Sequence, residues 1–302
     1  MKTAFKWIGI ILGIVLGAVT IIALGLYSLG QMRLKKMYDV SKETVFIPTD
    51  DESLLEGKRI FQYRGCEACH GEELQGLVYL DNPAIGQVIT PNLTSGLGGI
   101  GASRADEDLV RAIRHGLRPD GTPLLFMPST EFYYLSDEDL GKALAYIRSQ
   151  PPVNNEMPAS ALSFTGFIVM NLTRDITFIP AELIPHDAPR PSAPQPGVTI
   201  EYGQYLSLSC MVCHGVTFSG GQIPGFPPEW PAAPNLTSGQ GGRLPAWGED
   251  GFIQIIRTGE KHGRRLGIGF MPWTSYRYMN DDELRAVYLY LMSLEPKDFG
   301  NR

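Results

Sequence analysis

The chain is poor in cysteine and has no excess of positive charge, and each shortage excludes a class of protein. Four cysteines among 302 residues are too few for a small secreted domain built on disulfides. Lys and Arg together number 26 against 32 Asp and Glu, so the net charge is -6 and no nucleic-acid partner is expected. Charged residues make up 19% and hydrophobic ones 43%, which excludes a disordered chain and leaves room for two modest domains.

No charged residue occurs between Trp7 and Leu29, a run of 23 positions. A helix of this length, rising about 1.5 Å per residue, crosses a hydrocarbon core of about 30 Å, whereas the apolar part of a signal peptide has about 7 to 15 residues. We therefore expect residues 1–36 to form an N-terminal transmembrane anchor. The alternative is cleavage after Gly25, because Ala23 and Gly25 are small residues at the two positions that a signal peptidase recognises.

Two segments of the chain repeat each other at an offset of 143 to 144 residues. The first contains CEACHG from Cys66, PNLTSGLGG from Pro91, FMP from Phe126 and SDEDL from Ser136; the second contains CMVCHG from Cys210, PNLTSGQGG from Pro234, FMP from Phe270 and NDDEL from Asn280. The motif His and the Met of FMP are 57 residues apart in both copies. We interpret the copies as one duplicated domain, at 37–150 and 197–302. Residues 151–196, which hold nine of the 23 Pro, are expected to form a connector in which Phe164 to Met170 is apolar enough to lie against a domain or the membrane surface.

Each copy is predicted to be helical. Ser136 and Asn280 are suitable helix N-caps, and an acidic residue follows each of them three positions later. Apolar residues then recur at helical spacing: Leu140, Ala143, Leu144 and Ile147 in the first copy, and Leu284, Val287, Tyr288 and Leu291 in the second. The predicted fold class is therefore all-α, with a transmembrane helix followed by two tandem domains with long loops.

The pattern Cys-x-x-Cys-His, present once in each copy, is typical of covalent haem c attachment. Residues three and four apart share one face of a helical turn, so both thiols can reach the two vinyl groups of one haem while the His lies below the iron. We therefore expect two covalently bound haem c groups, one on Cys66, Cys69 and His70 and the other on Cys210, Cys213 and His214. A zinc site or a redox dithiol also uses paired cysteines, but neither requires a His after both pairs.

Met127 and Met271 stand at matched positions, each before a Pro, and are the predicted sixth ligands of the two irons. Proline keeps the preceding residue extended and outside a helix, which suits a loop that presents a thioether to a metal. The expected metal ligands are His70 with Met127 and His214 with Met271. With both axial positions filled, such a haem transfers electrons and has no vacant site for a substrate.

Arg114 and Arg257 also match across the copies, and two interpretations stay open. Each guanidinium could bind a buried haem propionate, or each could be an ordinary charge on a helix surface. The remaining histidines, His115, His186 and His262, have no matching His, and we expect surface or hydrogen-bonding roles for them.

With the run RAIRHGLRPDG from Arg111, these motifs resemble those of membrane-anchored dihaem c-type cytochromes, and most closely the cytochrome subunits of bacterial alcohol and gluconate dehydrogenases. The resemblance covers both repeats, about two thirds of the chain. Those subunits usually have three haems and a carboxyl-terminal membrane attachment, whereas two motifs and an amino-terminal span occur here. The resemblance implies haem attachment outside the bacterial cytoplasmic membrane, and hence a single-pass protein with both haem domains on the periplasmic side.

The favoured hypothesis is a membrane-tethered dihaem cytochrome c that is not itself an enzyme. It would carry single electrons in a respiratory or photosynthetic-type chain, from a dehydrogenase or quinol-oxidising complex to a terminal acceptor such as an oxidase or a soluble cytochrome. The alternative is a dihaem enzyme, a peroxidase or thiosulfate-oxidising cytochrome, favoured only by the asymmetry of His115 opposite Thr258. A third hypothesis, compatible with the first, is an integral subunit of a membrane complex, as in high-affinity haem-copper oxidases.

Overall fold

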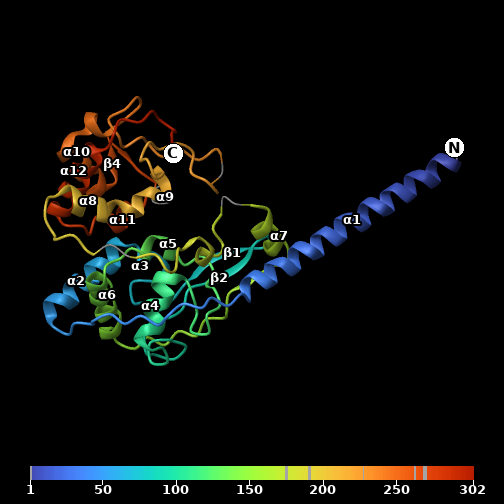
Figure 1. Ribbon diagram of the computed structural model, residues 1–302, viewed down its shortest axis with the longest axis horizontal. Helices are drawn as coiled ribbons and strands as arrows, with labels where there is room; N and C mark the ends of the chain where they lie inside the picture. Colours follow the sequence, from blue (N-terminus) through green and yellow to red (C-terminus); the bar gives the residue numbers. More distant parts are fainter. Residues whose placement is uncertain (1, 174–175, 190–191, 227, 262, 268–270) are drawn as a thin grey trace.

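The computed structural model describes residues 2–173, 176–189, 192–226, 228–261, 263–267 and 271–302. Its first helix, α1 (Lys2–Leu34), projects from the rest of the molecule as a long rod (Figure 1). The large apolar side chains from Phe5 to Leu24 are exposed on this rod. By length and composition, α1 is able to cross a membrane, which is consistent with the predicted anchor and equally with a signal sequence.

The remainder of the described chain forms two halves with the same order of helices, and the predicted mostly helical fold is confirmed. The first half contains α2 (Asp51–Tyr63), α3 (Cys66–His70), β1 (Val78–Asn82), β2 (Gly86–Ile89), α4 (Asp106–His115), α5 (Ser129–Phe132) and α6 (Asp137–Ser149). Between the halves lie β3 (Ala161–Leu162), α7 (Phe164–Leu172) and the 3-10 helix η1 (Pro180–Leu183). The second half contains α8 (Ile200–Ser207), the 3-10 helix η2 (Leu208–Cys210), α9 (Met211–His214), α10 (Leu244–Thr258), β4 (Glu260–Lys261), β5 (Arg264–Arg265), α11 (Trp273–Tyr276) and α12 (Asp281–Ser293).

The last helix of each half begins where its sequence predicts. In α6 the side chain of Ser136 accepts a hydrogen bond from the backbone N–H of Asp139, and in α12 Asn280 and Glu283 form a reciprocal capping box. The predicted apolar faces of both helices are buried, with Leu140 and Leu284 almost fully enclosed. The helix caps and the helical spacing of apolar residues are both confirmed.

The first and last helices of each half cross at a glycine. A Cβ atom at Gly57 of α2 would lie 2.0 Å from the backbone oxygen of Lys142, and one at Gly203 of α8 would lie 1.9 Å from that of Ala286. Lys142 and Ala286 occupy equivalent positions of the repeat. Both halves therefore depend on the same close approach of two helix backbones.

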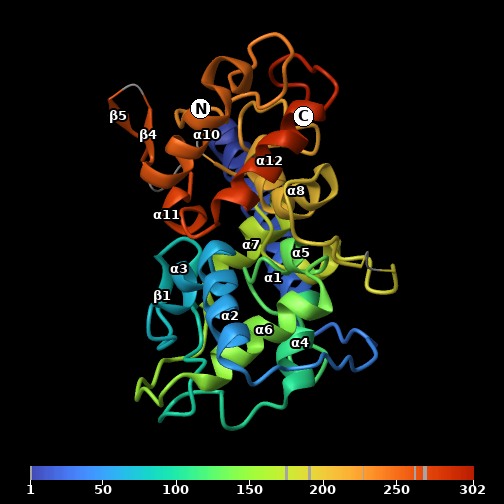
Figure 2. The same cartoon turned by 90° about the vertical axis from the view of Figure 1, so that its left-hand side faces the viewer.

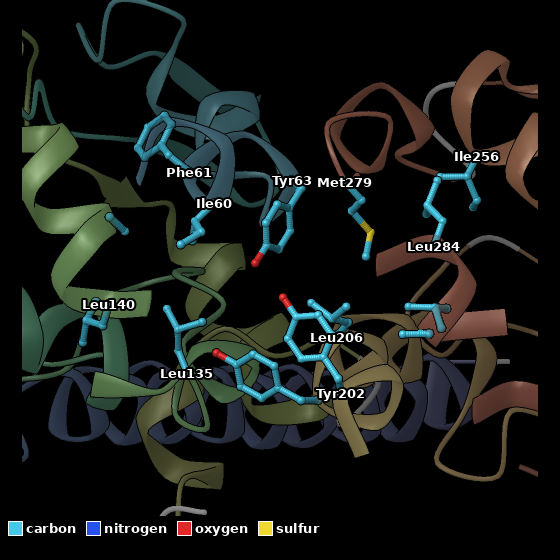
Figure 3. Close-up of a cluster of buried hydrophobic side chains, with 14 of the residues drawn as sticks. Ile60, Phe61, Tyr63, Leu135, Leu140, Tyr202, Leu206, Ile256, Met279 and Leu284 are labelled. Atoms are coloured by element: carbon cyan, nitrogen blue, oxygen red, sulfur yellow. The ribbon is translucent and has the colours of Figure 1, made fainter. Parts of the chain in front are cut away.

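One hydrophobic core runs across the junction between the halves. Figure 3 shows Ile60 and Tyr63 of α2 and Leu140 of α6 on one side, and Leu206 of α8 and Leu284 of α12 on the other. Because these side chains pack in a single cluster, the two halves share one hydrophobic core and are not separate domains joined only by a linker.

Two polar contacts across the junction are reciprocal. Arg59 Nη2 of α2 lies 2.8 Å from the Oε1 atom of Glu283, and the hydroxyl of Tyr205 in α8 donates to Asp139 Oδ2 at 2.6 Å. In both cases the first helix of one half reaches the carboxylate in the first turn of the other half's last helix. Such a pairing is the pattern of an interface around a two-fold axis.

Residues 151–196, expected as a connector, do join the halves, but they also complete the first half. Strand β3 pairs antiparallel with β2, and Phe167 and Met170 of α7 are buried in a second hydrophobic cluster. Helix α7 also packs on the end of α1, where the side chain of Asn171 donates to the backbone oxygen of Leu26 at 2.9 Å. The small sheet was not predicted from the sequence, because its third strand has only two residues.

Gly57→Ala is expected to destabilise the protein, because the added Cβ would overlap the Lys142 carbonyl. Overpacking of this kind costs about 1–3 kcal/mol or more. Gly251→Ala in α10 is the matched control, since its Cβ would lie at an ordinary 3.5 Å from Trp247 Cβ. Thermal unfolding of the full-length protein in detergent should show a lower midpoint for the first variant alone. Equal midpoints for the two variants would contradict the close helix crossing.

Candidate functional site

The first Cys-x-x-Cys-His motif forms the short helix α3 and faces a cavity. Gly65 and Gly71 flank this helix in left-handed conformations, with φ values of 76° and 83°, which a residue with a side chain rarely adopts. A cavity of about 480 Å³ is lined by Cys66, Cys69, His70 and Met127 together. Met127, 57 residues after His70, therefore meets the first motif at one place.

Apolar side chains form most of the remaining wall of this cavity. They include Val88, Leu109, Leu117 and Phe132, all of which are buried. A cavity of this size with an apolar wall and a few polar groups is typical of a cofactor site.

A backbone carbonyl orients each motif histidine. His70 Nδ1 lies 3.2 Å from the oxygen of Pro91, and His214 Nδ1 lies 2.9 Å from that of Pro234. Since a carbonyl only accepts, Nδ1 carries the proton and Nε2 keeps its lone pair for a metal. Burial lowers the pKa of both imidazoles and so favours this neutral form.

The PNLTSG block holds that carbonyl in place, a role that the sequence reasoning did not assign. The side-chain amide of Asn92 donates to the oxygen of Val153 at 2.7 Å, and that of Asn235 donates to the oxygen of Lys297 at 2.7 Å. The oxygen of each amide accepts from the N–H of the Thr two residues later. The block is nearly identical in the two copies, and this similarity could have indicated from the sequence that it supports the site.

The two predicted methionine ligands have the same local backbone. The N–H of Ser129 donates to the oxygen of Met127 at 2.7 Å, and that of Trp273 donates to the oxygen of Met271 at 2.8 Å. In each half the following Pro precedes a short helix, α5 or α11. Met271 is half-buried and packs against the shared core. Phe270, which begins the second FMP block, lies outside the described residues.

The cysteine thiols do not have the character of a redox dithiol. Burial raises the pKa of Cys66 and of Cys210 to about 12, whereas a reactive Cys-x-x-Cys pair stabilises its thiolate. All four cysteines are free and half-buried. Within the described ranges no cluster of three or more His, Cys, Asp or Glu is arranged to hold a metal ion. Thiols with raised pKa values, beside a His with a free Nε2 and an apolar cavity, fit thioether-linked haem c.

Arg114 and Arg257 are bound by protein groups. Arg114 is only 1% exposed, and its guanidinium donates to the oxygen of Leu135 at 2.9 Å and pairs with Glu43 and Asp137. Arg257 repeats this arrangement with the oxygen of Met279 and with Asp281. Arg114 is not among the residues that line the cavity of the first motif. The repeat match marks a clamp between α4 or α10 and the start of the last helix, and the contact of either arginine with a haem propionate stays a prediction.

Two of the three unmatched histidines, His115 and His186, form hydrogen bonds, as expected. His115 Nδ1 lies 2.9 Å from His186 Nδ1, and His115 Nε2 lies 3.2 Å from Glu43 Oε1. His115 is not among the residues lining the described cavity, so its asymmetry with Thr258 does not create an open catalytic site there. His262 lies outside the described residues.

Arg114→Leu distinguishes the clamp from a propionate contact. Removing one partner of a buried ion pair costs about 3–5 kcal/mol, so the clamp predicts a marked fall in unfolding temperature with little change in either haem potential. Arg257→Leu is the matched comparison, because the side chain of Arg257 is 30% exposed, against 1% for Arg114, and the same loss should cost about 1 kcal/mol. A lowered potential of the first haem with unchanged unfolding would contradict the clamp.

Comparison with known proteins agrees with this geometry. Residues 52–147 match the family model of the cytochrome c oxidase, cbb3-type, subunit III, and residues 200–295 match that of cytochrome c. The cytochrome c subunit of a quinone alcohol dehydrogenase from Gluconacetobacter polyoxogenes is 28% identical over 283 residues, covering 82% of this chain and 58% of the relative.

Two further relatives are cytochrome subunits of other dehydrogenases. The fructose dehydrogenase cytochrome subunit of Gluconobacter japonicus is 27% identical, with 77% of this chain and 50% of the relative covered. The gluconate 2-dehydrogenase cytochrome c subunit of Pantoea cypripedii is 25% identical, with 82% and 61% covered. The chain spans between half and about three fifths of the length of these relatives. It therefore carries two cytochrome c domains, with sites that fit two covalent haem c groups, and is homologous to the cytochrome c subunits of quinone alcohol, fructose and gluconate dehydrogenases.

Proposed function

We propose that this chain is a membrane-tethered dihaem cytochrome c that passes single electrons from a dehydrogenase to a membrane-bound or soluble acceptor. One observation carries the proposal: in each half a buried motif histidine is fixed through Nδ1 by a proline carbonyl, which leaves Nε2 for iron. In the first half Cys66, Cys69 and Met127 line the same cavity. The bound haem supplies one-electron exchange at its iron.

The protein groups have separate tasks in this proposal. Cys66 and Cys69, and likewise Cys210 and Cys213, would hold the haem by thioether bonds. His70 with Met127, and His214 with Met271, would be the ligands of its iron. The apolar wall of the cavity excludes water, and burial together with a Met ligand raises a haem's reduction potential.

Occupation of both axial positions favours electron transfer over catalysis. A dihaem peroxidase or thiosulfate-oxidising enzyme needs a vacant or exchangeable position on one iron. Each half instead offers a Met before a Pro at the same distance from its motif His. The one asymmetry that favoured an enzyme, at His115, is explained by its hydrogen bonds to His186 and Glu43.

The membrane attachment follows from α1 and its contact with the first half. Side chains before Leu26 are mostly exposed and apolar, whereas from Leu26 onward the helix packs on α7. At the end of α1, Arg33 Nε donates to Glu182 Oε1 at 2.9 Å and fixes the helix to the domain. We infer that the hydrocarbon core ends near Leu26 and that both halves lie on the periplasmic side, where haem c is attached in this class of cytochrome.

The ligand assignment is tested by Met127→Ala and Met271→Ala. Each variant should remove the thioether-to-iron band of one oxidised haem, convert that haem to high spin and lower its potential, while the other haem keeps its spectrum. Met157→Leu is the matched control, because Met157 lines the first cavity but has no counterpart in the repeat. Optical redox titration of all three variants measures the spectrum and the reduction potential of each haem.

Two results would overturn the assignment. A high-spin, ligand-accessible haem in the unaltered protein, with turnover of peroxide or thiosulfate, would favour the dihaem enzyme. Loss of the thioether band in Met157→Leu, with the band unchanged in Met127→Ala, would show that Met157 and not Met127 is the ligand.

The partner is tested by purification of the tagged full-length chain in mild detergent from its own membranes. The proposal predicts that a dehydrogenase subunit copurifies and that an alcohol, fructose or gluconate added to the preparation reduces both haems. A matched preparation in which His70 and His214 are replaced by Ala should retain the partner and show no such reduction. A chain that purifies alone, with haems that stay oxidised in intact membranes given each substrate, would contradict the dehydrogenase assignment.

A further inference from the structure

Both haem motifs lie at the junction between the halves. In Figure 1 helices α3 and α5 are at the edge of the first half that faces α9 and α11 of the second, and Figure 2 shows α3 next to α11 from another side. The Cβ position of Gly65, directly before the first motif, is 3.9 Å from Ser275 Oγ in α11. Cys66 and Cys210 both pack against the shared core. The thioether edges of the two haems would therefore approach each other across this junction.

Arg64 lies at the centre of this junction. Its guanidinium is 5.2 Å from the ring centre of Tyr63 in its own half and 5.2 Å from that of Tyr205 in the other half. Arg64 also lines the cavity of the first motif. Burial raises the pKa of both Cys66 and Cys210, and the charge of Arg64 partly offsets that rise in each, so its field reaches both motifs.

Two nitrogens of Arg64 lack a partner. Nε and Nη2 are buried and make no hydrogen bond to any of the described residues. A buried donor without an acceptor costs about 1–3 kcal/mol. Arg59, Arg114 and Arg257 are by contrast ion-paired, although Arg114 Nε also lacks a hydrogen-bond partner. Arg64 therefore brings a positive charge with two unused donors to the junction.

Two carboxyl groups interact electrostatically with this charge, Asp139 and Glu131 of α5. Asp139 also accepts a hydrogen bond from the hydroxyl of Tyr205, which crosses from the other half. Burial raises the pKa of Glu131 to about 7. Replacing Arg64 by a neutral residue would therefore make the electrostatic potential at the junction more negative.

The second half has different residues at the equivalent positions. Counted back from the first Cys of each motif, the residue equivalent to Arg64 is Leu208. Likewise, Glu131 of the first half is matched by Ser275. A single guanidinium therefore lies at a junction that is otherwise formed by two copies of the same unit.

We propose that Arg64 is a positioning residue shared by both haems, and that its guanidinium raises the reduction potential of each of them across the junction. A nearby positive charge stabilises the reduced form of a haem, because reduction adds one negative charge. The effect is strong here since the group is buried and little screened. The inference rests on the proposed function, because it requires two low-spin haems at these motifs.

The test compares Arg64→Gln, which removes the charge, with Arg64→Lys, which keeps it. Spectroelectrochemical titration of the full-length protein in detergent should show both midpoint potentials lowered in Arg64→Gln. The expected change in each reduction equilibrium constant is on the order of tenfold, which is about 59 mV for a one-electron couple. Arg64→Lys should restore most of the shift. Arg64→Leu, which introduces the side chain found in the second half, provides the neutral comparison if Arg64→Gln folds poorly.

Arg104→Gln is the matched control. Arg104 lines the first cavity but is exposed, so its removal should change only the first haem, and by less. A shift confined to one haem in Arg64→Gln, or an equal shift in Arg64→Lys, would overturn the shared role of Arg64 while leaving electron transfer intact. Absence of two low-spin haems in the unaltered protein would instead overturn the proposed function.

Discussion

The hydrogen bond between a motif histidine and a proline carbonyl is the contact on which the rest of the arrangement depends. It fixes which nitrogen of His70 and of His214 carries the proton, and so determines which nitrogen is available to iron. The carbonyl is itself held by the neighbouring Asn, which bonds to the chain that follows the last helix of the same half. Axial ligation is thus connected to the loop beyond α6 or α12, and the identical PNLTSG blocks preserve this connection in both halves.

Duplication explains the junction as well as the sites. Arg59 with Glu283 and Tyr205 with Asp139 are reciprocal contacts between equivalent helices. They bring both motifs to the same interface, and the two short helices that follow the ligand methionines lie there too. Arg64 breaks this symmetry, since its repeat equivalent is Leu208. A symmetric scaffold with one unsymmetric charge can hold two haems close together and tune both from a single side chain.

The local features of the fold could be predicted from the sequence, because each depends on residues close together in the chain. The caps at Ser136 and Asn280 and the apolar faces of α6 and α12 are of this kind. The cysteines, histidines and methionines that we propose as haem ligands were predicted from their spacing in two copies. The ion pair of Arg114 with Asp137 could have been predicted, because Asp137 and Asp281 match across the repeat as Arg114 and Arg257 do. The contact of Arg64 with Tyr205 could not be predicted, because Tyr205 is distant in sequence and only tertiary packing brings it to the junction. For the same reason the part of residues 151–196 that completes the first half could not be recognised from its Pro content.

The most direct test of the central claim is near-infrared magnetic circular dichroism of the oxidised full-length protein, combined with a pyridine haemochrome assay of its haem content. The account predicts two covalently bound haems for each chain, both low-spin and both with the charge-transfer signature of histidine and methionine ligation. A single haem, a bis-histidine signature, or a high-spin haem in either half would contradict it.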